Sequence, residues 1–253
     1  EELVERGVSS KSPIMLKLML ILEQPTRRWR TRAQAVSFTP GRRRAAAIAL
    51  IKLSSKLCKP LSERMQAAAA RGLALALPKR LATPRLVPGL LSTAECTLLL
   101  GEAEAYGQVH GWGSLHRKYP TVDLSVAKLP CGESINQLMK ERALPAFSHL
   151  FGAEYGPPGQ LRFRDLFVAK YEAHEQAGLS GHVDASFLSL VMQLNSPDEF
   201  EGGGTYFEHS DMLLRPEQGN AAFFLGKVFH EGRCITRGRR FVLVALIDRA
   251  GHG

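Results

Sequence analysis

The sequence lacks any uninterrupted apolar run near the length needed to cross a bilayer. The longest apolar stretch near its start, IMLKLMLIL, is short and contains Lys17. The 253 residues include only four cysteines, and no two of them form a C-x-x-C pair; they are Cys58, Cys96, Cys131 and Cys234. These absences argue against a transmembrane segment and against a zinc ribbon, and free thiols are the default reading of the cysteines.

Acidic residues are absent between Glu23 and Glu63, and charge divides the chain accordingly. Residues 1–82 hold 17 Lys and Arg against 5 Asp and Glu, whereas residues 83–253 hold 16 against 19. An acid-poor, Arg-rich segment resembles an organelle transit peptide, and a disordered or loosely helical basic arm explains it equally well. A nucleic-acid-binding arm is disfavoured because the run matches no recognisable module. The compartment stays open between an organelle and the endoplasmic reticulum.

Prolines at positions 78, 84 and 88 mark a boundary. We therefore expect a basic N-terminal arm over residues 1–85, with amphipathic helices, and a folded domain over residues 86–253. The segment STAE at Ser92–Glu95 fits a capping box and predicts a helix after it. A second amphipathic helix is expected in GESINQLMKERALPAFSHLF, with an interruption near Pro145.

From Gly159 onward the pattern changes to short runs rich in β-branched and aromatic residues, separated by Gly, Pro, Asn or Asp. These runs are QLRFRDLFVAKYE, FLSLVMQLN, GGTYFE, DMLLRP, NAAFFLG and RFVLVALID. Such spacing is typical of antiparallel sandwiches and barrels. Helices first and strands afterwards predict a mainly β domain with bracing helices (α+β), built on a double-stranded β-helix, or jelly-roll, core.

Two candidate metal ligands, His182 and Asp184, are one residue apart at the expected start of an apolar strand. Residues i and i+2 of a strand share a face, so imidazole and carboxylate should converge while Val183 turns away. Among the downstream histidines, His230 is the best third ligand because it lies at a strand edge beside apolar segments. Two histidines and one carboxylate with open positions suit non-haem Fe(II) and oxygen chemistry, and zinc is the competing metal.

Arg240 follows His230 by ten residues and opens a strand that is apolar on both faces. Arg239 and Arg240 must point to opposite faces, so one is solvated and the other enters the core, where an unpaired guanidinium is costly. A buried arginine prefers a planar anion that it can hold with two hydrogen bonds. The anion is either a dicarboxylate that also reaches the metal or a distant Asp or Glu of the chain.

Residues from roughly Pro88 to Asp248 resemble the catalytic domain of 2-oxoglutarate- and Fe(II)-dependent dioxygenases, most closely the prolyl 4-hydroxylase-like branch, with the lysyl hydroxylases near. The resemblance rests on HVD at residues 182–184, a distant histidine, and an arginine ten residues later, together with FEGGGTYF. It implies that His182, Asp184 and His230 hold the iron and are the catalytic set. It also implies that Arg240 binds the distal carboxylate of 2-oxoglutarate.

The resemblance further implies that Tyr171, Gln193 and Thr205 face the co-substrate pocket, although Tyr171 is nearly as well explained as a core residue. The glycines of EGGGTYFE are better explained by a tight turn than by catalysis. The cofactors and co-substrates implied are Fe(II), 2-oxoglutarate, O₂ and L-ascorbate, which keeps such iron reduced.

The function implied is hydroxylation of a side chain in a peptide or protein substrate, with proline as the first candidate residue. A lysyl or small-molecule hydroxylase of the same family is the second reading. A catalytically inactive jelly-roll binding module is the third, and the intact ligand set argues against it. A nucleic-acid binder that acts through the basic arm is the fourth, and such binding should weaken steeply with salt.

Overall fold

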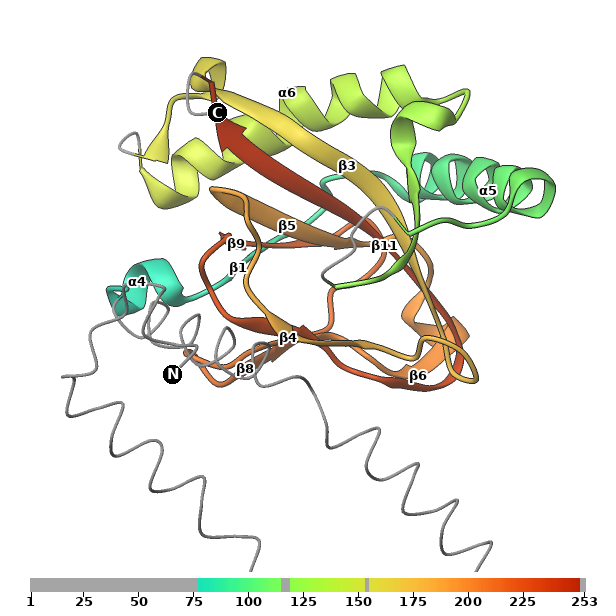
Figure 1. The fold of residues 1–253 in the computed structure, drawn as a ribbon. Coiled ribbons are helices and arrows are strands. Elements are labelled where there is room, and N and C mark those ends of the chain that lie inside the picture. The colour runs from blue at the N-terminus through green and yellow to red at the C-terminus, as the bar shows by residue number, and fades with distance from the viewer. Residues whose placement is uncertain (1–76, 115–118, 153–154, 251–253) are drawn as a thin grey trace, which may run out of the picture. The chain divides into compact units, whose positions relative to one another are not determined.

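The computed structural model describes residues 77–114, 119–152 and 155–250, shown in colour in Figure 1. The helices expected in the basic arm lie outside the described residues, and the extent of the arm over residues 1–85 stays a prediction. The first described elements are a short helix, α4 (Lys79–Ala82), and strand β1 (Arg85–Val87). Leu81 and Ala82 of α4 are buried, and β1 pairs with strand β9.

Two antiparallel sheets form the core of the fold (Figure 1). The major sheet has the order β1-β9-β5-β11-β3-β2, and a short strand, β6, pairs with β11 off this path. Its strands besides β1 are β2 (Val122–Ser125), β3 (Leu161–Glu172), β5 (Leu188–Gln193), β6 (Phe200–Gly202), β9 (Ala221–Leu225) and β11 (Ile235–Arg249). The minor sheet has the order β4-β10-β7-β8. Its strands are β4 (Leu179–His182), β7 (Thr205–Phe207), β8 (Met212–Leu214) and β10 (His230–Gly232). The predicted mainly β jelly-roll core is confirmed.

Two long helices lie on the outer side of the major sheet, α5 (Thr93–His110) and α6 (Gly132–Phe151) (Figure 1). Ser92 caps α5 in the predicted capping box, since its hydroxyl accepts from the Glu95 amide while the Glu95 carboxylate accepts from the Ser92 amide. Short 3₁₀ turns at Val126–Lys128, Pro158–Gln160 and Pro197–Glu199 join other elements.

The expected interruption of the second helix is wrong, because α6 continues through Pro145. Proline removes one backbone donor and normally breaks a helix interior. Here Leu144, Phe147 and Phe151 are buried on the face that α6 turns to the sheet. Burial of this apolar face outweighs the local penalty, as tertiary packing commonly does for helices.

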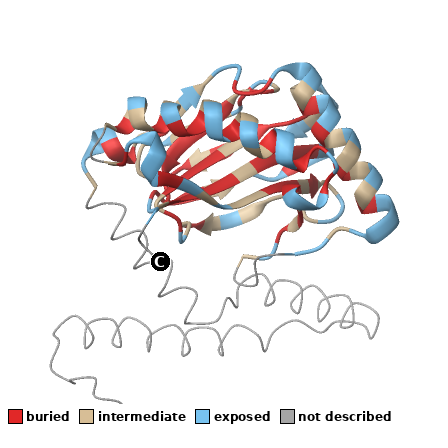
Figure 2. Ribbon diagram, turned by 90° about the horizontal axis from the view of Figure 1, so that it is seen from above, coloured by how far each residue is buried: buried red, intermediate tan, exposed pale blue. Residues whose placement is uncertain are grey.

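The main core fills the space between the major sheet and the helices. Phe147 of α6 stacks on Phe223 of β9 with ring centroids 4.2 Å apart, and buried residues gather on the strands and on the inner faces of the helices (Figure 2). Along β3, Val168 joins this core while Phe167 and Ala169 join a second, smaller cluster on the opposite face of the sheet. The period of two therefore gives the major sheet two apolar faces, and the second one looks toward the minor sheet.

Among the described helices, none combines the length and the apolar composition that a bilayer crossing needs. Within the same residues Cys96 and Cys131 are buried, Cys234 is exposed, and all three are free thiols.

Candidate active site

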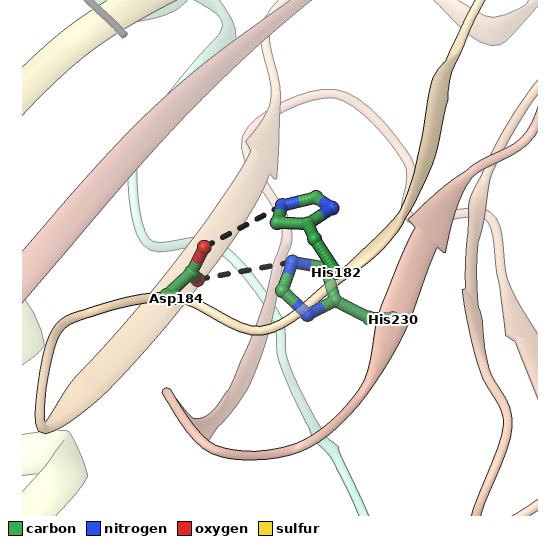
Figure 3. A group of neighbouring side chains, drawn as sticks. All are labelled: His182, Asp184 and His230. Atoms are coloured by element: carbon green, nitrogen blue, oxygen red, sulfur yellow. Dashed lines mark ion pairs between the residues drawn. The ribbon is translucent and has the colours of Figure 1, made fainter. Parts of the chain in front are cut away.

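His182, Asp184 and His230 converge between the two sheets (Figure 3). Their candidate ligand atoms all lie within 4.8 Å of one another. The His182 Nε2 atom lies 3.5 Å from Asp184 Oδ1, and the His230 Nε2 atom lies 3.7 Å from Asp184 Oδ2. The three residues predicted from the sequence are thus brought to one point, although the outer two lie 48 positions apart in the chain.

Strand pairing in the minor sheet explains how the two histidines meet. His182 is the last residue of β4 and His230 is the first residue of β10, and they are direct partners across this antiparallel pair. Directly opposed residues have Cβ atoms about 5 Å apart, which lets two imidazoles reach one ion. Asp184 lies just beyond β4, where its backbone amide donates to the Gly226 carbonyl at 2.8 Å.

The local geometry differs from the sequence expectation in one respect. The HVD segment ends β4 rather than starting the next apolar strand, β5, and Val183 lines the same cavity instead of turning away. The carboxylate still reaches the histidines although it lies outside the strand, because β4 ends at His182 and the alternation of an ideal strand need not continue beyond it.

Backbone carbonyls fix the proton on each imidazole. The Nδ1 atoms of His182 and His230 lie 2.9 Å from the carbonyl oxygens of Ser180 and Val228. A carbonyl only accepts, so each Nδ1 carries the hydrogen and each Nε2 presents a lone pair toward Asp184. This arrangement is typical of metal-ligating histidines. Two lone pairs and a carboxylate that face one another need a cation between them, so the donor set fits a divalent metal ion.

The protonation states agree with this fit. Burial lowers the pKa of His230 to about 4 even though Asp184 opposes the shift, so this imidazole is neutral at pH 7. Burial alone would raise the pKa of Asp184, but the neighbouring His230 and His182 lower it to about 2. His230 therefore offers a neutral nitrogen and Asp184 an ionised carboxylate, and together with His182 they form the ligand set of an open non-haem iron site.

A cavity of about 500 Å³ opens beside these three residues. This volume lies within the range of about 300–1,000 Å³ that is usual for small-molecule sites. Cross-strand pairs of β3 and β11 form one of its walls; these pairs are Tyr171–Arg240, Ala169–Val242, Phe167–Val244 and Asp165–Leu246. The wall runs from a cation at one end, over apolar side chains, to a carboxylate at the other.

Arg240 is 2% exposed, whereas Arg239 is exposed and pairs with Glu104 at 2.8 Å. The expectation that the two arginines separate between core and solvent is confirmed. Arg240 Nε donates to Gln193 Oε1 at 3.0 Å, and Arg240 Nη1 donates to the Gly204 carbonyl at 3.4 Å. No carboxylate in the described part of the chain pairs with this guanidinium. Burial lowers the pKa of Arg240 below its usual value, because the charged guanidinium is removed from water. An anionic ligand would offset the free-energy cost of burying this charge.

The three remaining predicted site residues have different surroundings. Tyr171 and Thr205 line the cavity and are 6% and 3% exposed. The Arg240 guanidinium carbon lies 5.7 Å from the centroid of the Tyr171 ring. Gln193 is 1% exposed and is not part of the cavity wall. Together with Arg240 it lines a smaller cavity of about 230 Å³, and its amide oxygen accepts from the arginine, so its place in the co-substrate pocket stays a prediction.

Tyr119 and Asn195 are not among the site residues predicted from the sequence. Tyr119 lines the cavity, and its ring centroid lies 4.8 Å from that of His182. Asn195 is 1% exposed and bonds to Gln193 and to the backbone of β11. A buried asparagine two residues after a buried glutamine, at the end of an apolar strand, is the signal that could have identified Asn195.

Comparison with curated proteins identifies procollagen lysine hydroxylases as relatives, while no family model matches the chain. The multifunctional procollagen lysine hydroxylase and glycosyltransferase LH3 of Rattus norvegicus is 31% identical over 170 residues, which cover 63% of this chain and 22% of that protein. Procollagen-lysine,2-oxoglutarate 5-dioxygenase 1 of Mus musculus is 28% identical over 173 residues, covering 63% and 23%. The chain therefore spans less than a quarter of the length of these relatives.

Solved structures with the same fold include prolyl hydroxylases. The viral collagen prolyl hydroxylase of Paramecium Bursaria Chlorella virus-1, in its 2-oxoglutarate complex, has a TM-score of 0.51 at 18% identity, covering 67% of this chain and 96% of that chain. A Pseudomonas putida prolyl-4-hydroxylase has a TM-score of 0.51 at 15% identity, covering 70% and 100%. Taken together with the convergent His-Asp-His set, these likenesses show that the chain has the fold of the prolyl 4-hydroxylase-like, 2-oxoglutarate- and Fe(II)-dependent dioxygenases and is similar in sequence to part of the procollagen lysine hydroxylases.

Proposed function

We propose that this domain hydroxylates a side chain of a peptide or protein substrate, with Fe(II), 2-oxoglutarate and O₂. One observation carries the proposal: a convergent His-Asp-His set shares a cavity with a buried guanidinium that no described carboxylate neutralises. A metal site alone would fit many hydrolases, but an anion anchor within the same cavity fits a diacid that reaches the metal.

In this proposal His182 and His230 hold Fe(II) through Nε2 and Asp184 holds it through a carboxylate oxygen. Bound iron would couple the oxidative decarboxylation of 2-oxoglutarate to insertion of oxygen into a C–H bond, so that one atom of O₂ enters succinate and the other forms the hydroxyl. Ascorbate typically keeps the iron of this family reduced. The three ligands leave the remaining coordination positions to the co-substrate and O₂.

Residues of the cavity wall bind and orient the diacid. Arg240 would pair with its distal carboxylate through the N–H donors that Gln193 and Gly204 leave free. Tyr171 and Thr205 would contact the same carboxylate from the sides, since both line the cavity near the arginine. Phe167, Val242 and Val244 exclude water from the middle of the cavity, which strengthens the ion pair.

The substrate residue is lysine or proline, and the two candidates differ in their support. The sequence relatives are procollagen lysine hydroxylases, whereas the prolyl hydroxylases share only the fold at less than 20% identity. Lysine is therefore the better supported target, and proline, the first candidate from the sequence, is the alternative.

Succinate release by the purified full chain, with Fe(II), ascorbate, 2-oxoglutarate and lysine- or proline-containing peptides, tests this function. Mass spectrometry should find a gain of one oxygen on the peptide in step with succinate. An Asp198→Ala variant, changed at an exposed carboxylate outside the cavity, is the control for Asp184→Ala, which should release none. Succinate formation that survives in Asp184→Ala would refute the metal assignment. Binding of 2-oxoglutarate and peptide without turnover would favour the inactive module instead.

A further inference from the structure

We propose that Gln193 and Asn195 are positioning residues that fix the orientation of Arg240 for the distal carboxylate of the diacid co-substrate. The inference rests on the proposed function, because it assigns a task to Arg240. Neither side chain lines the larger cavity beside the metal set, and Gln193 lines a smaller cavity together with Arg240, so we expect their effect on the ligand to pass through the arginine.

Gln193 holds the guanidinium itself. Its Oε1 accepts from Arg240 Nε at 3.0 Å, and the Gly204 carbonyl accepts from Nη1 at 3.4 Å. A guanidinium has five N–H donors in one rigid plane. The donors on Nε and Nη1 are held by Gln193 and by the Gly204 carbonyl. The guanidinium plane therefore cannot rotate freely, and the remaining donors keep one direction. An uncharged acceptor in this place leaves the positive charge of Arg240 available to a ligand, whereas a carboxylate would neutralise it.

The amide orientation of Gln193 is determined by its other bonds. Its Nε2 donates to Asn195 Oδ1 at 2.9 Å, to the Asn195 carbonyl at 3.2 Å and to the Phe241 carbonyl at 3.3 Å. All three are acceptors, so the NH₂ group must face them and the oxygen must face Arg240.

Asn195 holds the backbone on both sides of the arginine. Its Oδ1 accepts from the Phe241 amide at 2.8 Å, and its Nδ2 donates to the Arg239 carbonyl at 2.9 Å. The side chain thus replaces a strand partner just beyond Gln193, where β5 ends. Asn195 Nδ2 also donates to Glu199 Oε2 at 3.1 Å, which connects this clamp to the capped turn at Pro197–Glu199. Backbone and guanidinium of Arg240 are therefore fixed by two neighbouring amides of one segment.

The test measures binding to the metal-loaded full chain by calorimetry, with Mn(II) in place of Fe(II) so that no turnover occurs. The ligands are 2-oxoglutarate and 2-oxobutyrate, a 2-oxo acid without the distal carboxylate. The variant Gln193→Met keeps the unbranched shape of glutamine and removes its amide. Gln218→Met is the matched control, because the Gln218 amide donates to the Leu194 carbonyl and lies outside the bonds to Arg240.

Loss of one hydrogen bond to a charged group predicts that Gln193→Met weakens 2-oxoglutarate binding about tenfold. Binding of 2-oxobutyrate should not change, and Gln218→Met should bind both ligands like the unmodified protein.

Gln193→Glu should weaken 2-oxoglutarate binding further than Gln193→Met, because its carboxylate neutralises Arg240. A residue that only filled space would give the opposite order, since Glu is the closer isostere. Asn195→Asp, which keeps the Oδ1 acceptor and loses the donor to Arg239, should weaken 2-oxoglutarate selectively as well.

A double-mutant cycle separates action through Arg240 from a general effect. In an Arg240→Met background, Gln193→Met should cause no further loss of 2-oxoglutarate affinity. Independent losses that multiply would overturn the proposal, and so would an equal loss of 2-oxobutyrate binding in Gln193→Met alone.

If the unmodified protein bound neither 2-oxo acid, the proposed function itself would fail. If it bound 2-oxoglutarate and Gln193→Met bound it equally well, only this inference would fail. Asn195→Asp answers the same question should Gln193→Met not fold.

Discussion

Replacing Arg240 by methionine removes the anion anchor while it preserves most of the volume of the side chain. Gln193 and Gly204 use two of the five guanidinium donors, so a carboxylate can still accept two charge-assisted hydrogen bonds. Each is worth about 1.5–3 kcal/mol, and breaking a buried ion pair costs about 3–5 kcal/mol in total. We therefore expect the Kd for 2-oxoglutarate to rise by a factor on the order of 10²–10³.

Metal binding should change little in this variant, because Arg240 belongs to β11 of the major sheet and the ligands belong to β4, β10 and the loop after β4. Calorimetry with 2-oxoglutarate, and separately the visible spectrum of bound Co(II), measure the two affinities. Arg240→Lys keeps the charge but loses the planar donors, so it should fall between methionine and arginine. Equal losses of metal and 2-oxoglutarate would show that Arg240 is a structural residue and would refute the reasoning.

Three further predictions concern the metal, the core and a capped helix. His182→Ala should abolish metal binding and succinate release, as measured by metal analysis after dialysis and by turnover. Phe147→Ala should lower the free energy of unfolding by about 3–5 kcal/mol in urea titrations, because the ring is fully buried against Phe223. Glu95→Gln should make stability less dependent on pH in acid. The Arg142 side chain and the Ser92 backbone lower the pKa of Glu95 from 4.5 to about 2, so the carboxylate stabilises the fold above about pH 4.5 and loses this effect as the pH falls toward 2. An equal fall in stability for Glu95→Gln and the unmodified protein between pH 5 and pH 3 would contradict this assignment.

Strand periodicity and caps made much of the fold predictable. The alternation along residues 161–172 reappears as the two faces of β3, with Val168 in one core and Phe167 in the other. The Ser92–Glu95 capping box starts α5 as expected. The prediction of an interruption at Pro145 was wrong. The local tendency of proline to break a helix was outweighed by packing of the apolar face of α6, and this packing depends on β9, some 80 residues later in the chain.

The metal set was predictable because its chemistry requires particular residue types, and only His230 had to be chosen among several histidines. The position of Gln193 was not predictable, since a buried amide at a strand end bonds equally well toward a ligand or toward a neighbouring side chain. That choice depends on the register of β5 against β11, where Val242 faces Gln193. No local sequence pattern specifies this register.

The site is shared between the two layers of the jelly roll in an unequal way. Both imidazoles come from the minor sheet, whereas the guanidinium comes from the major sheet. A metal ion by itself thus cross-links mainly one layer, and a diacid that bridges metal and arginine would tie the layers together across the cavity. The rise in melting temperature on adding 2-oxoglutarate to the metal-loaded protein should therefore exceed the rise caused by a monoacid at equal occupancy. The diacid would contact both sheets at once and so stabilise their relative position, whereas a monoacid would contact only the metal.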